Sequence, residues 1–192
     1  HDFVRWGPVI EGDVRDAAAL TAAIKSTNPA AVMHFAALSL VGQSVEQPSL
    51  YEDVNCGGTK NLLAAMVACD VRVLVFSSTA AIFREPDTDL IDETTAQLPT
   101  SPYGKTKLAC EEMIRAAESN DGLRSACLRY FNAAGADPDM EVGEDHANET
   151  HLIPLILDVA LGRRKNVHVF GDDYETADGT AVRDYIHVSD LA

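Results

Sequence analysis

Short apolar runs alternate with longer segments of helical composition along most of this chain. The apolar runs occupy residues 8–12, 31–36, 72–76 and 123–129, and the helical segments occupy residues 17–26, 48–69 and 103–120. Parallel strands are joined by helical crossovers and are buried on both faces, so they appear in a sequence as short apolar runs. The alternation therefore predicts βαβ units, an α/β fold class and a doubly wound parallel sheet.

Two stretches, residues 85–101 and 137–149, have the composition of loops. Beyond them, residues 152–161 predict a helix, and residues 167–170 and 182–188 predict two short strands. We expect residues 1–135 to form the main sheet domain and residues 136–192 a smaller region interleaved with its last elements. The chain does not begin with methionine, and we expect it to be the central part of a longer polypeptide, truncated at both ends.

The composition excludes some classes of partner. A formal net charge of −15 disfavours a nonspecific nucleic-acid binder, because such proteins need basic surface to replace the counterions of phosphates. No run of about 18 apolar residues is present to span a bilayer, and the first residues lack the pattern of a signal peptide. The sequence therefore predicts no nucleic-acid partner and no membrane association.

The four cysteines show neither close pairing nor the spacing of zinc ligands; they are Cys56, Cys69, Cys110 and Cys127. Free thiols in a reducing cytosol are the expected state, so we predict a cytoplasmic protein with no metal site. His34 lies between Met33 and Phe35 in an apolar run. We interpret it as a hydrogen-bonded core residue and not as a ligand.

Polar residues follow several of the predicted strands. Asp13, residues 36–39, residues 77–79 and residues 130–132 all come directly after an apolar run. Ligands of open parallel sheets bind outside the carboxyl ends of the strands, where these segments meet. The convergence predicts an enzyme that uses a nucleotide.

Tyr103 and Lys107 are four residues apart at the predicted start of a helix, so their side chains share one face. A phenol with a pKa of about 10 is a poor base at neutral pH, and a nearby positive charge favours the phenolate. Lowering the pKa by roughly three units needs about 4 kcal/mol, which a lysine and a cationic cofactor supply together. Tyr103 is thus a candidate general base, with the Thr79 hydroxyl as its partner. The alternative is a surface aromatic and lysine pair.

The order Ser77-Ser78-Thr79-Ala80-Ala81 followed by Tyr103-x-x-x-Lys107 resembles the extended short-chain dehydrogenase/reductases, and within them the UDP-glucose 4-epimerases. The resemblance implies a Rossmann-like sheet, NAD as cofactor and a UDP-sugar as substrate. It makes residues 1–135 a partial NAD-binding domain and residues 136–192 a partial substrate-binding region. It also implies a homodimer formed through the long helices near residues 48–69 and 103–120.

The resemblance also assigns residues to the cofactor. The segment with Asp13 and Val14 contacts the adenine, and the turn with Phe35, Ala36 and Ala37 passes under the cofactor. Asn55 lies close to it, and Tyr130 or Phe131 flanks the nicotinamide. Ser77, Tyr103 and Lys107 complete the implied set. The residues alone leave two plainer roles open: Asp13 as a helix cap, and Asn55 as a bridge within a helix.

Further residues are assigned to the substrate. Asn132 binds the sugar nucleotide, and His151 and Leu152 begin a helix that touches the UDP. Arg183, in the run from Gly179 to Val188, binds the diphosphate. The implied substrate set is completed by Thr79, Tyr103, His168, Phe170 and Tyr185. Plainer alternatives are a turn role for Asn132 and a surface ion pair of Arg183 with Asp184.

The activity implied is the interconversion of UDP-galactose and UDP-glucose through transient oxidation at C4 of the hexose. One departure matters, because the family's Gly-x-x-Gly-x-x-Gly turn has no match among the 12 glycines. We therefore expect this chain alone to bind NAD poorly and to be inactive. The enzymatic alternatives are another sugar-nucleotide epimerase or a 4,6-dehydratase, which typically carries Asp-Glu where this chain has Ala80-Ala81. A further alternative, which is not an enzyme, is a noncatalytic nucleotide-binding module.

Overall fold

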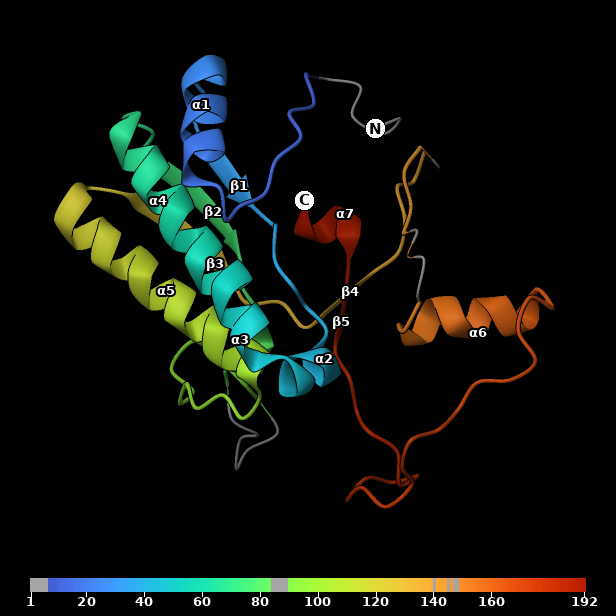
Figure 1. Ribbon diagram of the computed structural model, residues 1–192. Coiled ribbons are helices and arrows are strands. Elements are labelled where there is room, and N and C mark those ends of the chain that lie inside the picture. Colours follow the sequence, from blue (N-terminus) through green and yellow to red (C-terminus); the bar gives the residue numbers. More distant parts are fainter. Residues whose placement is uncertain (1–6, 84–89, 140, 145, 147–148) are drawn as a thin grey trace. The chain divides into compact units, whose positions relative to one another are not determined.

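The computed structural model describes residues 7–83, 90–139, 141–144, 146 and 149–192. These residues form two compact units, the first ending at Tyr130 and the second beginning at Phe131. Figure 1 shows the helices and strands of both.

The first unit contains a parallel sheet of three strands, β1 (Val32–His34), β2 (Val73–Ser77) and β3 (Arg124–Leu128). The strand order is β1-β2-β3, and every pair is parallel. A helical run connects β1 to β2, and another connects β2 to β3. The predicted α/β class with a parallel sheet is confirmed.

All but one of the α-helices described in this unit lie where the sequence predicts them. They are α1 (Ala17–Thr27), α2 (Val41–Glu46), α3 (Pro48–Tyr51), α4 (Gly58–Ala68) and α5 (Pro102–Asp121). The predicted helix over residues 48–69 is present as one continuous run, but its middle is a π-helical turn, η1 (Glu52–Gly57). π-turns are uncommon and are frequent at functional sites. Helix α2 was not predicted.

Helix ends follow from identifiable residues. The Asp16 side chain caps α1 by accepting from the Ala19 amide, and Asn28 ends that helix in the left-handed conformation. In α5 the Ser101 hydroxyl accepts from the Gly104 amide, Pro102 occupies the first turn, and Gly122 ends the helix with φ of 67°. These are the preferred residues at such positions, because they satisfy free amides or tolerate positive φ.

The core lies on one face of the sheet. Leu74 and Phe76 of β2 are each 1% exposed, and they pack with α4 and α5 residues such as Met66 and Ile114. Helices α1, α4 and α5 lie side by side against the strands (Figure 1). On the opposite face of β1, Met33 is 60% exposed. The buried face thus fixes the position of α5 relative to the ends of β2 and β3.

The second unit contains a parallel pair, β4 (Asn132–Ala134) and β5 (Tyr185–His187), on which α7 (Val188–Leu191) packs. Helix α6 (Leu152–Ala160) confirms the predicted helix over residues 152–161. Strand β5 is shorter than the predicted strand over residues 182–188, and β4 was not predicted. No helix in the described parts of either unit combines the length and the apolar character that crossing a bilayer requires.

Two predicted strands are wrong. Residues 8–12 and 167–170 form no strand, and Ile10 and Phe170 are 53% and 95% exposed. An extended segment counts as a strand only when a neighbour accepts and donates its ladder of hydrogen bonds. Neither segment has such a neighbour among the described residues, so an apolar composition alone gave the wrong prediction.

The interpretation of His34 as a core residue is confirmed. The side chain ends β1 at 6% exposure, and its Nε2 is hydrogen-bonded to Thr59 Oγ1 at 3.1 Å. Burial, with a smaller contribution from the positive charge of Lys107, lowers the pKa of His34 to about 4. The ring is therefore neutral in the folded protein at neutral pH.

This lowered pKa predicts acid sensitivity. Between pH 6.5 and about 4 the unfolded chain binds a proton at His34 that the folded chain does not, so stability falls as the pH is lowered through this window. The loss reaches about 3 kcal/mol. We expect His34→Gln to flatten the dependence of the unfolding free energy on pH, measured by urea titration. Exposed His168→Gln is the control, and an unchanged slope in His34→Gln would contradict the assignment.

Candidate active site

Three hydroxyl residues, Ser77, Ser78 and Thr79, extend from the carboxyl end of β2. The Ser78 amide continues the sheet ladder by donating to the Leu128 carbonyl at 2.9 Å. The chain then turns into a 3₁₀ helix, η2 (Ala80–Ile82), in which the Thr79 hydroxyl accepts from the Ala81 amide at 3.1 Å. The sheet and this turn together fix the backbone on both sides of Thr79.

Helix α5 brings Tyr103 and Lys107 to the same place. The Tyr103 amide donates to Ser44 Oγ at 3.1 Å, which attaches the start of α5 to α2. Tyr103 is 9% exposed and Lys107 is 3% exposed. Burial to this degree excludes the alternative of a surface aromatic and lysine pair.

The ammonium group of Lys107 lies between the strand end and the phenol. Its Nζ donates to the Ser77 carbonyl at 2.9 Å and lies 5.9 Å from the centre of the Tyr103 ring. It also lies 4.8 Å from the Phe76 ring, a cation–π distance. The Ser77 hydroxyl is hydrogen-bonded to the Tyr130 hydroxyl. The structure therefore gathers five predicted residues at the ends of β2 and β3; they are Ser77, Thr79, Tyr103, Lys107 and Tyr130.

The electrostatics of this group differ from the prediction. Burial raises the pKa of Tyr103 above its ordinary value, and a hydrogen bond with the Thr79 side chain opposes the rise. Burial also lowers the pKa of Lys107. The predicted lowering of the Tyr103 pKa by Lys107 is thus not found. Burial of the phenol outweighs the Thr79 hydrogen bond, and the Lys107 ammonium is directed at the Ser77 carbonyl.

Asn55, in the π-helical turn, connects the loop after β1 to α5. Its Oδ1 accepts from the Leu38 amide at 2.8 Å, and its Nδ2 donates to the Leu38 carbonyl at 3.1 Å and to Thr106 Oγ1 at 3.2 Å. The Phe35 side chain at the start of that loop is 54% exposed, and Ala36 is also exposed. Asn55 therefore fixes the turn of Phe35, Ala36 and Ala37 while leaving its outer surface open.

Asp13 lies in an open depression of the first unit with Arg15 and Asp53. Its carboxylate accepts from Arg15 Nη2 at 2.6 Å, and this contact lowers the Asp13 pKa to about 2. The helix-capping alternative does not hold, since Asp16 caps α1. Val14 packs over Gly58, where an added Cβ would lie 2.6 Å from Val14 Cγ2.

The substrate residues expected beyond Tyr130 belong to the second unit. The Asn132 side chain donates to the Asp184 carbonyl at 2.8 Å and so joins β4 to the start of β5. Arg183 donates to the Val182 carbonyl and makes no ion pair with Asp184 among the described residues. Phe131, His168, Phe170 and Tyr185 are exposed. His151 and Leu152 begin α6, where no side chain caps the helix.

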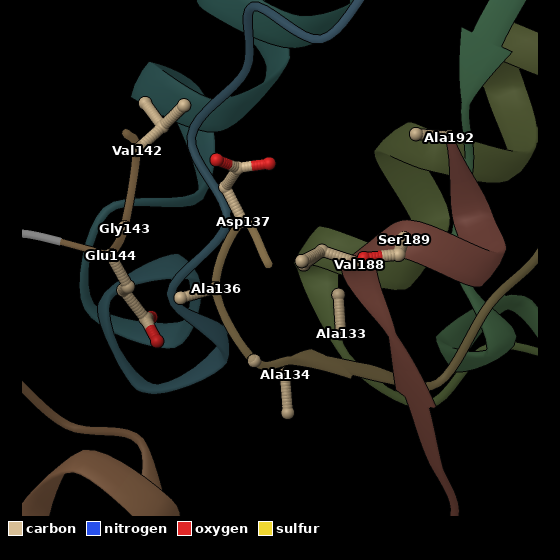
Figure 2. Close-up of a pocket in the computed structure, with 11 residues that line it drawn as sticks. Ala133, Ala134, Ala136, Asp137, Val142, Gly143, Glu144, Val188, Ser189 and Ala192 are labelled. Carbon is tan, nitrogen blue, oxygen red and sulfur yellow. The ribbon is translucent and has the colours of Figure 1, made fainter. Parts of the chain in front are cut away.

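A pocket of about 480 Å³ lies at the carboxyl end of β4, between it and α7 (Figure 2). Small residues such as Ala133, Ala134 and Gly135 line it, and its charged residues are Asp137 and Glu144. None of the predicted site residues lines it. Two carboxylates disfavour an anionic ligand, so this pocket does not fit the diphosphate expected for the second unit.

Two further residues position the site and were not predicted as site residues. Ser44 holds the amide of Tyr103, and a buried carboxylate on α5, Glu111, contacts Ser78 and Arg129. Glu111 was detectable in principle, because it continues the helical spacing of Tyr103 and Lys107 on a buried face. Ser44 gave no such signal, since its helix was not predicted.

The fold and this group of side chains define a Rossmann-like α/β protein with a threonine, tyrosine and lysine site at the strand ends. The sequence profile of the NAD dependent epimerase/dehydratase family matches residues 2–192. The chain belongs to that family.

Among its relatives are two curated proteins called UDP-glucose 4-epimerase. The one from Rhizobium leguminosarum bv. trifolii is 52% identical over 192 residues, which is 100% of this chain and 59% of that protein. The one from Halalkalibacterium halodurans is 53% identical over 181 residues, covering 94% of this chain and 54% of the relative. The chain thus spans somewhat more than half the length of the curated relatives it matches.

Two solved structures are similar in fold and sequence. The UDP-glucose 4-epimerase from Brucella ovis, in complex with NAD, superposes with a TM-score of 0.93 at 49% identity, covering 98% of this chain and 58% of that one. The enzyme from Bifidobacterium longum, in complex with NAD⁺ and UDP, gives a TM-score of 0.90 at 41% identity, covering 96% and 57%.

The closeness of α5 to the Thr79 turn makes Gly104 a test of this packing. A Cβ there would overlap the Ala81 carbonyl oxygen and lie 3.0 Å from Pro99 Cβ. We expect Gly104→Ala to lower the free energy of unfolding by about 1 to 3 kcal/mol, although alanine favours helices over glycine by about 1 kcal/mol.

Gly57→Ala is the matched control. Gly57 is also helical, and a Cβ added there would lie 3.8 Å from the nearest atom, which is an ordinary contact. We expect Gly57→Ala to leave stability unchanged or to raise it. The free energies of unfolding of the two variants are compared by urea titration. Equal values would disprove the tight packing at Gly104.

Proposed function

We propose that the full-length protein carrying this sequence is an NAD-dependent UDP-glucose 4-epimerase, which interconverts UDP-galactose and UDP-glucose. The observation that carries the proposal is the group formed by Thr79, Tyr103 and Lys107 at the ends of β2 and β3. The identity of 52% to an enzyme of that name over the whole chain supports the same reaction.

The residues of the first unit fit the nicotinamide half of NAD. The buried Lys107 ammonium has three protons and one hydrogen-bond acceptor among the described residues, the Ser77 carbonyl. The turn after β1 leaves Phe35 and Ala36 exposed at a strand end, where such ligands bind. NAD, when bound, supplies the acceptor and donor of the hydride. Asp13, Val14, Ala37, Asn55, Tyr130 and Phe131 would complete the cofactor site.

Each side chain of the group has a distinct task in the proposed reaction. Tyr103 removes the proton from O4 of the hexose and later returns it, as a positioned acid and base. Thr79 is hydrogen-bonded to the phenol and favours its ionised form. Lys107 holds the Ser77 carbonyl and places a positive charge beside the phenolate when it forms.

The second unit supplies the proposed binding site for the UDP part of the substrate. Helix α6 begins at Leu152 with no side-chain cap, and free amides at a helix start favour phosphate. Arg183 is exposed and adds a permanent positive charge that suits a diphosphate. Asn132, His151, His168, Phe170 and Tyr185 are the remaining proposed substrate residues. Holding the nucleotide away from C4 leaves the sugar free to turn over.

A 4,6-dehydratase is the nearest alternative, and one similar structure is described as a dTDP-glucose 4,6-dehydratase from Streptomyces venezuelae at 28% identity. Elimination of water needs an additional acid and base. This chain has Ala80 and Ala81 where we expect such residues, so the proposal favours epimerisation. A cytoplasmic location and a homodimer formed through the helical run over residues 48–69 and through α5 are parts of the same proposal.

The first test is an assay of the full-length protein with UDP-galactose and without added NAD. We expect UDP-glucose to form, and Tyr103→Phe to reduce turnover by at least about a hundredfold, because the variant keeps the ring and loses the proton-transferring oxygen. Absence of conversion in folded protein that binds UDP, even with NAD supplied, would reject the reaction.

Thr79 gives a second test through the pH dependence of turnover. The Thr79 hydrogen bond lowers the Tyr103 pKa, so its removal raises that pKa, and the rise of activity with pH moves to higher pH. We expect this shift in Thr79→Val. Thr79→Ser keeps the hydroxyl and should keep the wild-type profile, whereas identical profiles for both variants would exclude the role.

A further inference from the structure

A buried carboxylate lies two helical turns beyond Tyr103 on the same face of α5. Glu111 follows Tyr103 by eight residues and Lys107 by four, a spacing that places all three side chains in one row. Glu111 is 1% exposed. A carboxylate that far from water costs several kcal/mol unless it is paired and hydrogen-bonded, so its partners define what it does.

The main partner of Glu111 is Arg129, directly after β3. Arg129 Nε donates to Oε1 at 3.0 Å and its Nη2 donates to Oε2 at 2.7 Å, which is the two-pronged geometry of strong arginine pairs. Arg115 Nη1 adds a longer contact to Oε2 at 3.4 Å. The pair connects the middle of α5 to the residue that precedes Tyr130.

The same carboxylate binds the segment after β2. Ser78 Oγ donates to Glu111 Oε1 at 2.5 Å, and Ser78 is 2% exposed. Its neighbour Ser77 offers its carbonyl to Lys107, and its other neighbour Thr79 is hydrogen-bonded to Tyr103. A displacement of Ser78 therefore moves the partner of Lys107 and the partner of Tyr103 at once.

We infer that Glu111 is a positioning residue of the candidate active site: held by Arg129, it fixes Ser78 and so sets the contacts of Thr79 and Ser77 with Tyr103 and Lys107. The consequence for turnover rests on the proposed function. The consequence for Tyr103 itself does not, because it concerns only contacts within the first unit.

Neutralising Glu111 affects the pKa of Tyr103 in two opposite ways, one through the lost charge and one through the lost hold on Ser78. The charged groups that face Glu111 are Arg129 and Arg115, and the thiols of Cys110 and Cys127 are titratable groups near it. The titratable groups that act on Tyr103 include the phenols of Tyr51 and Tyr130. Removing a negative charge favours the phenolate and lowers the pKa of Tyr103. Loosening Ser78 weakens the hydrogen bond of Thr79 with Tyr103, and this raises the pKa of Tyr103.

The experiment is an ultraviolet titration of Tyr103 in the full-length protein, with each variant measured against the same variant carrying Tyr103→Phe. We expect Glu111→Gln and Ser78→Ala to raise the Tyr103 pKa by about one unit. Glu112→Gln is the matched control, since it removes the same charge from the next, exposed position of α5, and it should leave the pKa unchanged. An unchanged or lowered pKa in Ser78→Ala overturns the inference.

Ser78→Ala keeps the inference testable if Glu111→Gln does not fold, because it leaves the ion pair with Arg129 intact. In the epimerase assay we expect both variants to lose about tenfold to a hundredfold in kcat with KM almost unchanged. If the wild-type protein does not epimerise, the proposed function fails while the titration still decides the role of Glu111. A loss confined to KM would also count against positioning.

Discussion

The burial of charged side chains along one face of α5 is the constraint on which the first unit depends. Lys107 and Glu111 are 3% and 1% exposed, and neither charge is tolerated there without partners. The partners lie at or just beyond the carboxyl ends of β2 and β3, at Ser77, Ser78 and Arg129. Helix α5 can therefore adopt only one register against the sheet, and this register is the one that places Tyr103 beside Thr79.

The apolar core alone would not fix that register. Residues such as Ile114 and Phe76 form non-directional contacts, and a core tolerates exchange of apolar side chains when total volume and pattern are kept. Polar contacts at the strand ends add direction, since each hydrogen bond holds for one arrangement of donor and acceptor. Asn55 acts in the same way at Thr106, one residue before Lys107 on α5, through its contacts with Leu38 and Thr106. The core supplies stability, and these polar contacts supply the geometry of the site.

Much of the first unit could be predicted from periodicity, because its strands and helices are apolar on the faces that pack together. Residues 8–12 and 167–170 were predicted wrongly as strands, since pairing depends on a neighbour that composition does not reveal. The π-helical turn at Asn55 was also invisible, because its composition is that of an ordinary helix. The group of Thr79, Tyr103 and Lys107 was predicted from the helical spacing of Tyr103 and Lys107, the place of Thr79 after a predicted strand, and the resemblance to a known family. Glu111 shares the helical spacing of Tyr103 and Lys107, but its contact with Ser78 and the contact of Ser44 with Tyr103 could not be predicted. Those contacts join residues that are 33 and 59 positions apart.

The raised pKa of Tyr103 makes proton removal in the proposed reaction depend on a cation bound beside the phenol. Burial disfavours the phenolate more than the Thr79 hydrogen bond favours it, so this unit by itself keeps the base protonated. The ammonium of Lys107 is directed at a carbonyl and does not reverse the balance. Lowering the pKa by roughly three units still requires about 4 kcal/mol, and the described part of the chain supplies position but not that energy. A cation bound beside the ring, such as oxidised nicotinamide, would supply it, and proton removal at O4 would then be confined to the state that can also accept the hydride.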